Sequence, residues 1–199
     1  IGMAGYEQPQ GEQFYRDVVE RVESLPGVEA TALAQGGPLQ VTISRSILLE
    51  GRPSDFERTF VQVNVIGPRY FDTMGIPLAQ GRAFEESDRT GSVPVVIVNQ
   101  TMAERMWPGE DVLGQRFRFH GMEPLEVVGV AADIKYNAPG EDPQPYAYLP
   151  LGQHYSTTMT LIARAESDPG PTLLAAQREI RQMDPLLPLI GVATVPDLI

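Results

Sequence analysis

Histidine and acidic side chains are the residues of this 199-residue chain that could bind a metal or transfer protons. The two histidines, His120 and His154, lack the H-x-x-x-H spacing of a helical metal site, and no Asp or Glu stands at a suitable offset from either. With no cysteine in the chain, thiolate zinc sites, Cys nucleophiles and disulfides are excluded. We interpret both histidines as surface residues and expect no metal and no cofactor.

The densest group of carboxylates is Glu85, Glu86 and Asp88. Neighbouring acids can serve acid–base catalysis or bind calcium, since hard cations prefer several oxygen ligands. The spacing of an EF-hand loop is absent here, and the acids stand beside Ser and Arg in a stretch bounded by glycine. A solvated loop is therefore the preferred interpretation.

Asp133 follows an apolar stretch and precedes Lys135, so it is either an active-site acid at a strand end or a turn-forming or ion-paired residue. A hydrolase using Asp133 with Glu126 or Glu85 is one hypothesis that this leaves open. Nucleophile-elbow, phosphate-loop and dinucleotide-binding motifs are all absent. The preferred prediction is a protein that is not an enzyme, with no catalytic, cofactor-binding or metal-binding residue.

A further short motif, Asn99-Gln100-Thr101, matches a glycosylation triplet. It also stands where a helix cap is needed. Asn99 can cap the following helix, while Thr101 and Glu104 have the spacing of a capping box, so the start of that helix stays open between them.

Charge argues against one class of partner. The chain has 26 acidic and 15 basic side chains, a net charge of −11, and its cations are scattered rather than gathered in a stripe. Proteins that bind nucleic acid concentrate Lys and Arg to neutralise phosphates. We therefore expect no nucleic-acid partner.

No run of residues approaches the roughly 20 apolar positions that span a bilayer.

Periodicity predicts mixed secondary structure, with long elements at both chain ends around a centre rich in Gly and Pro. Phe14, Val18, Val22 and Leu25 recur at helical spacing, and Pro26-Gly27 ends that helix. Further helices are predicted at 69–74, after Asn99, and from about Pro171, and strands at 28–34, 44–50, 59–66, 94–98, 115–119, 125–131, 146–149, 157–164 and 189–195. The side chains expected in the core are Phe14, Val18, Val22, Val61, Val63, Val96, Val98, Val128, Val130, Leu161 and Ile180.

Several local patterns follow one another in a fixed order along the middle of the chain. They are Tyr70–Leu78, Gly81–Phe84 with Asp88, Val95–Asn99, Trp107–Gln115, Glu126–Lys135 and Tyr146–Pro150. In this series the sequence resembles the extracytoplasmic core domain of MacB-type ABC transporter permeases. It is most similar to the acidobacterial-type duplicated permeases with FtsX-like membrane regions. Gln115 departs from the pattern, because the family often has a cation there.

The resemblance implies an α+β fold of two subdomains. Residues 1–67 and 151–199 would form a discontinuous porter-like α/β subdomain, and residues 68–150 an inserted, β-rich sabre-like subdomain. The domain would lie on the extracytoplasmic, periplasmic face of the bacterial cytoplasmic membrane, as part of an integral membrane protein.

The implied function is non-catalytic: the domain would couple motion of the transmembrane helices to substrate or partner handling outside the membrane. Implied partners are the parent permease helices, a cytoplasmic ATPase acting indirectly, and a second permease copy or a periplasmic adaptor. The alternative is a stand-alone extracytoplasmic ligand-binding or sensor module, which an apolar, partly enclosed cleft between the two subdomains would support.

Overall fold

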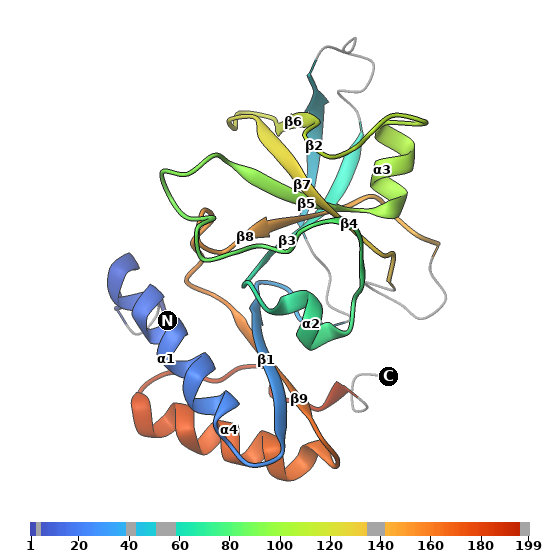
Figure 1. The fold of residues 1–199 in the computed structure, drawn as a ribbon. Helices are drawn as coiled ribbons and strands as arrows, with labels where there is room; N and C mark the ends of the chain where they lie inside the picture. Colours follow the sequence, from blue (N-terminus) through green and yellow to red (C-terminus); the bar gives the residue numbers. More distant parts are fainter. Residues whose placement is uncertain (3–4, 39–42, 51–58, 135–141, 196–199) are drawn as a thin grey trace.

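The computed structural model describes residues 1–2, 5–38, 43–50, 59–134 and 142–195, which build an α+β structure (Figure 1). Its elements in chain order are α1 (Gln8–Glu23), β1 (Val28–Ala34), β2 (Ile43–Leu49), β3 (Phe60–Ile66), α2 (Tyr70–Met74), β4 (Leu78–Gly81), β5 (Val95–Asn99), α3 (Gln100–Met106), β6 (Arg116–Phe119), β7 (Leu125–Ala131), β8 (Tyr146–Pro150), β9 (Thr160–Ala165) and α4 (Pro169–Met183).

Six strands pair into a closed ring in the order β2-β6-β7-β5-β8-β3, because β2 pairs with β6 through its second half and with β3 through its first. β5 runs parallel to β7 and β3 parallel to β8, whereas the other ring neighbours are antiparallel. β4 pairs with the end of β7. At the end of β3, β1 joins and forms an antiparallel pair with β9.

The side chains that the ring strands direct to one face meet in a single hydrophobic cluster, which we call the ring core. Met102, Met106 and Trp107 of α3 and the turn after it complete this cluster. Its strand members are Ile47, Leu49, Val61, Val63, Val65, Val96, Val98, Phe117, Phe119, Leu125, Val127, Val130, Ala147 and Leu149.

A second cluster, the middle core, lies on the other face of β5 and β8. Val95 and Ile97 belong to it, whereas Val96 and Val98 belong to the ring core, so β5 is buried on both faces. A strand with two buried faces needs an unbroken apolar run rather than alternation. Tyr70, Phe71, Tyr146 and Tyr148 bring their rings together here, with the Phe71 and Tyr148 centroids 4.9 Å apart.

The helical lobe consists of α1, β1, β9 and α4, with both helices packed against the β1–β9 pair (Figure 1). Phe14, Val18 and Val22 of α1 meet Ala176 and Ile180 of α4 in a third cluster. The two chain ends thus form one lobe.

Helix α1 shows how local sequence sets its own boundaries. Pro9 lies in the first turn, and Glu7 and Gln10 form a reciprocal capping box. Buried positions four residues apart give the helix one apolar face, as predicted. Gly27, at φ +80°, lies just beyond its C-terminal end.

Other predicted elements are confirmed with small shifts of boundary. The α4 helix begins at Pro169 rather than near Pro171, and Asp168 caps it by accepting a hydrogen bond from Gly170 N at 3.0 Å. The start of α3 is settled in favour of Asn99, whose side chain accepts from Met102 N at 3.0 Å. Nine of the eleven predicted core residues are buried, whereas Val128 and Leu161 are half-buried.

The predicted last strand, 189–195, is wrong. These residues form no strand, and within the described structure β9 pairs with β1 alone. Leu186 and Ile190 are 87% and 80% exposed, so this stretch has apolar residues but no neighbouring strand to pair with. Conversely, β4 was not predicted, because Leu78–Gly81 is short and has one partly buried position followed by three exposed ones.

Candidate functional site

A buried polar junction forms where β5 and β7 end and β8 begins. Asn99 is fully buried, and its Oδ1 accepts from Met102 N at 3.0 Å and from Tyr146 N at 2.8 Å. Its Nδ2 donates to Asp133 Oδ1 at 2.6 Å and to Gln144 O at 2.8 Å. All four hydrogen-bonding positions of the amide are used, so Asn99 is a structural residue rather than a glycosylation acceptor.

Asp133 completes this junction. Its Oδ1 also accepts from Thr101 N at 3.1 Å, and its Oδ2 accepts from Thr101 Oγ1 at 2.7 Å. The carboxylate therefore ties the end of β7 to the first turn of α3. Lys135, the neighbouring cation in the sequence, lies outside the described residues.

The geometry argues against the form of the hydrolase hypothesis that pairs Asp133 with Glu126. Glu126 lies at the start of β7 and Asp133 beyond its end, which separates them by about 20 Å of extended chain, twice the largest spacing of paired catalytic carboxylates. Glu126 is engaged by Arg116 at 2.7 Å instead. Among the described residues, no group of three His, Asp or Glu side chains is placed to hold a metal ion.

The acidic loop after β4 is only partly solvated. Glu85 and Glu86 are exposed as predicted, but Asp88 is 6% exposed, and the solvated-loop interpretation is wrong for it. Arg82 donates to both Asp88 oxygens at 2.7 and 2.9 Å, and Glu85 N donates to Oδ2 at 2.8 Å. The hydrogen bonds from Arg82, more than any other contact, lower the pKa of Asp88.

Replacing Asp88 by Asn should lower the free energy of unfolding by about 1–2 kcal/mol at pH 7, a modest figure because the Arg82 side chain is 39% exposed and screened by solvent. Since the folded-state pKa of Asp88 lies below its ordinary value of 3.8, the stabilisation is present above that pH and is lost as the pH falls through the folded-state value. Urea unfolding at neutral and acidic pH measures this. The exposed control Glu86→Gln should change little, and a deficit of Asp88→Asn that persists unchanged in acid would contradict the assignment.

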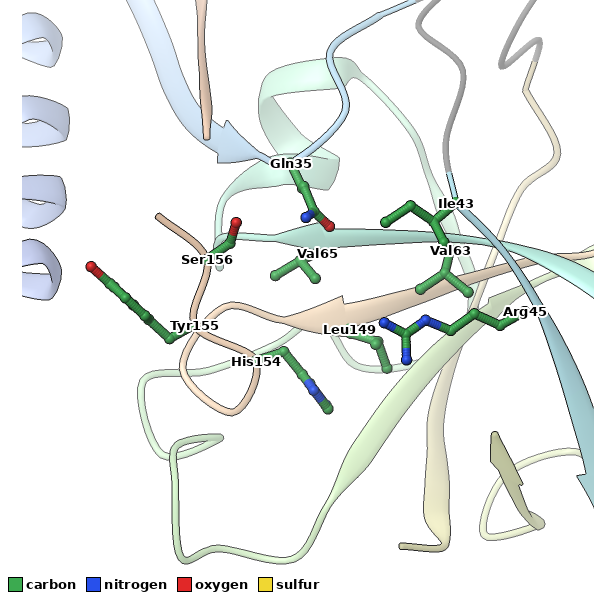
Figure 2. A pocket seen from close by; sticks show the side chains of 9 residues that line it. All are labelled: Gln35, Ile43, Arg45, Val63, Val65, Leu149, His154, Tyr155 and Ser156. Atoms are coloured by element: carbon green, nitrogen blue, oxygen red, sulfur yellow. The ribbon is translucent and has the colours of Figure 1, made fainter. Parts of the chain in front are cut away.

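A concave pocket of about 220 Å³ opens beside β2 and β3 (Figure 2). Three polar side chains reach it from separate segments: Gln35 after β1, Arg45 of β2 and His154 after β8. The remaining lining residues are Ile43, Val63, Val65, Leu149, Tyr155 and Ser156.

The prediction that both histidines are surface residues is wrong for His154. His120 is exposed, but His154 is half-buried, and its Nε2 is buried without a hydrogen-bond partner. Burial, and to a lesser degree the charge of Arg45, lower the pKa of His154 below its ordinary value. The ring is therefore neutral at pH 7.

Sequence reasoning missed this pocket for a physical reason. Its lining comes from four separate stretches, 35, 43–45, 63–65 and 149–156, which only the pairing of β2 with β3 and of β3 with β8 brings together. Arg45, the second residue of the predicted strand 44–50, gave no local signal, because an exposed arginine on a strand is ordinary.

A family model described as MacB-like periplasmic core domain matches residues 3–183. The chain belongs to this family. Its match includes every helix and strand of the structure, the Asn99 junction and the pocket.

Curated relatives agree with the family. A macrolide export ATP-binding/permease protein MacB of Paracoccus denitrificans is 29% identical over 78% of this chain and 22% of its own length. The MacB protein of Aggregatibacter actinomycetemcomitans is 32% identical over 71% of this chain and 21% of its own length. The chain thus spans about a fifth of the length of these relatives.

Solved structures share the fold. The periplasmic region of MacB from Actinobacillus actinomycetemcomitans superposes with a TM-score of 0.61 at 16% identity, covering 84% of this chain and 73% of the other. The extracellular domain of the ABC-type transporter YknZ from Gram-positive bacteria gives a TM-score of 0.60 at 18% identity, covering 84% and 82%. The predicted fold class is confirmed.

Within the described structure, no helix has both the length and the apolar character needed to cross a bilayer.

Proposed function

We propose that this domain works outside the cytoplasmic membrane as a stiff, non-catalytic lever of an ABC transporter permease. The observation that carries the proposal is the family match over residues 3–183, whose relatives are named as export ATP-binding/permease proteins. The domain would receive motion from the parent permease helices, which a cytoplasmic ATPase drives indirectly. It would present a surface to a second permease copy or a periplasmic adaptor, and not to nucleic acid, given its charge of −11.

Stiffness is supported by the way the three clusters share strands. β5 and β8 each contribute side chains to the ring core and the middle core, and β1 contributes Ala32 to the middle core and Leu33 to the helical lobe. Because close-packed interiors have low compressibility and transmit strain, a displacement of the helical lobe moves the ring as well.

Helix α2 strengthens this connection. Arg164 of β9 donates from Nε to Thr73 O at 2.9 Å and from Nη2 to Asp72 O at 3.1 Å, and so holds the C-terminal carbonyls of α2. The other side of α2 packs through Phe71 against Tyr148 of the ring. One short helix is thus fixed to both the helical lobe and the ring.

The two-subdomain division of residues 1–67 with 151–199 and 68–150 remains part of this proposal. Supporting it, the third cluster draws its buried members from residues 14–33 and 176–180, one set from each chain end. Val61, Val63 and Val65 of β3, however, pack in the ring core with residues 96–149. We therefore propose that the N-terminal boundary between the two subdomains lies before β2 rather than at residue 67, and that the two subdomains move together.

The experiment uses the intact transporter in lipid vesicles, with native cysteines elsewhere in the protein replaced. A fluorophore is placed at the exposed position Glu20 of α1. The efficiency of its energy transfer to headgroup-labelled lipid should differ between the transporter without nucleotide and the transporter with ATP held in its ATPase. Spin labels at Glu20 and the exposed Arg118 of β6 should keep their separation within about 2 Å, because the lever moves as one body.

Each readout can fail separately. If the energy transfer to lipid is unchanged by ATP, the domain does not follow the transporter cycle and the stand-alone binding module is favoured. If the separation of the two labels changes by several ångströms, the domain bends within itself and the lever is the wrong description.

A further inference from the structure

We propose that the pocket beside β2 and β3 binds an aliphatic carboxylate, either a small free acid or the C-terminal residue of a peptide. The inference does not depend on the role of the domain in transport, because it rests on the pocket's own residues. Three features carry it: a cation that pairs with no carboxylate of the described residues, an apolar wall, and two further polar side chains, of which His154 has a buried nitrogen without a hydrogen-bond partner.

The cation is Arg45. Its Nη1 contacts Met122 Sδ at 3.1 Å and its guanidinium lies 5.8 Å from the centroid of the Phe119 ring, but no carboxylate of the described residues pairs with it. Acids outnumber bases 26 to 15 in this chain, yet none of the acidic side chains in the part of the chain that the structure describes lines the pocket. The planar guanidinium is suited to bidentate recognition of a carboxylate from outside the domain.

The apolar wall explains why the anion would carry an aliphatic group. Val63, Val65 and Leu149 line the pocket, and they are members of the ring core whose faces turn toward this opening (Figure 2). Ile43, which is 50% exposed, stands at the rim. A branched aliphatic group would cover this apolar surface on binding.

Two further polar groups favour a carboxylate over a bare hydrocarbon. His154 Nε2 is buried without a partner, and the side-chain amide of Gln35 points into the same space from the opposite side (Figure 2). A neutral imidazole and an amide can each donate a hydrogen bond to a carboxylate oxygen. The Tyr155 hydroxyl points away from the pocket and takes no part (Figure 2).

Volume limits the ligand. The cavity, about 220 Å³, is smaller than the roughly 300–1,000 Å³ of pockets that enclose drug-sized ligands. One branched side chain with its carboxylate is the appropriate size. For so few contact atoms in an open site, we expect a Kd of about 1 mM.

The test is a titration of the 199-residue chain with methyl groups of Ile, Leu and Val labelled for NMR. The probes are isovalerate and the peptide Gly-Gly-Leu, each paired with its amide, isovaleramide or Gly-Gly-leucinamide. We expect saturable shifts at Val63, Val65 and Leu149 with the acids, and affinity at least tenfold lower for the amides. Tighter binding of the peptide than of isovalerate identifies a peptide C-terminus, and equal or weaker binding identifies a free acid.

Matched variants test the role of Arg45. Arg45→Gln should weaken binding at least tenfold, whereas Arg118→Gln, which removes the same charge from an exposed position of β6 that does not line the pocket, should leave the Kd within twofold. The imidazole signals of His154 report binding independently, because an anion beside the ring raises its pKa. The proposal is overturned if the wild-type pocket methyls show no saturable shift up to about 20 mM ligand, or if both variants respond alike.

Discussion

Replacing Asn99 by Asp should lower the free energy of unfolding by about 3–5 kcal/mol at pH 7. The native amide is fully buried and donates to Asp133 and to Gln144 O. An aspartate at this position has no hydrogen to donate and would place a second carboxylate within hydrogen-bonding distance of Asp133. Urea unfolding followed by tryptophan fluorescence measures the effect, because Trp107 is buried in the ring core.

Two controls separate charge repulsion from general disruption. Gln100→Glu adds the same charge one residue away, at an exposed position, and should change the stability by less than about 0.5 kcal/mol. The double variant Asn99→Asp/Asp133→Asn again places one amide beside one carboxylate. It should recover part of the free energy of unfolding that Asn99→Asp alone loses. The deficit of the single variant should also shrink in acid, where one carboxylate is protonated. Stability of Asn99→Asp within 1 kcal/mol of wild type would contradict the four-bond role of Asn99.

Elements with a complete local signal were predicted from the sequence. The helix around Phe14–Val22 carries its own periodicity and stop signal, and the strand Val28–Ala34 lies between the breaks Pro26-Gly27 and Gly36-Gly37-Pro38. The structure contains both elements. Ring closure was not predictable in this way. It depends on β2 pairing with β3 and with the distant β6, and no pattern inside Ile43–Leu49 specifies either partner.

The strand predicted at 189–195 is wrong for a related reason: its sequence is typical of a strand, but no neighbouring strand pairs with it in the described structure. Leu189 and Ile190 have the side chains of a strand, but a strand forms only where a neighbouring edge accepts its hydrogen bonds. Likewise, Asp88 was predicted to be solvated. Its partner Arg82 is six residues away, in a loop whose bend could not be predicted from the sequence. In each case, the missing information was the position of a second segment.

The motifs that reveal the family are architectural in this structure. Asn99 and Asp133 fasten the ends of β5, β7 and β8, and Tyr148 joins the middle core to α2. Phe84 is buried in the same core, and Arg82 holds Asp88. Such residues report which fold is built, so they carry little information about the substrate or partner of a particular member. Surface and pocket residues, such as Arg45, are where that information would lie.

Gly81 belongs to one of these motifs, and Gly81→Ala should lower the free energy of unfolding by about 3–5 kcal/mol. Gly81 has φ +74°, and it pairs with Gly129 across β4 and β7. A Cβ at Gly81 would lie 2.2 Å from Val128 O and 2.8 Å from Gly129 Cα, both backbone atoms that cannot rotate away. Two glycines facing each other let the short β4 approach β7 at this point.

The matched control is Gly121→Ala, because Gly121 has nearly the same backbone conformation, φ +78°, but a Cβ there would meet nothing within 4 Å. This variant carries only the cost of a left-handed backbone, about 1–2 kcal/mol. The difference between the two variants therefore isolates the close approach of β4 to β7, and we expect it to be at least about 2 kcal/mol in paired urea titrations. Equal losses in the two variants would mean that β4 can move away from β7 at little cost, and would contradict a stabilising close approach of the two strands.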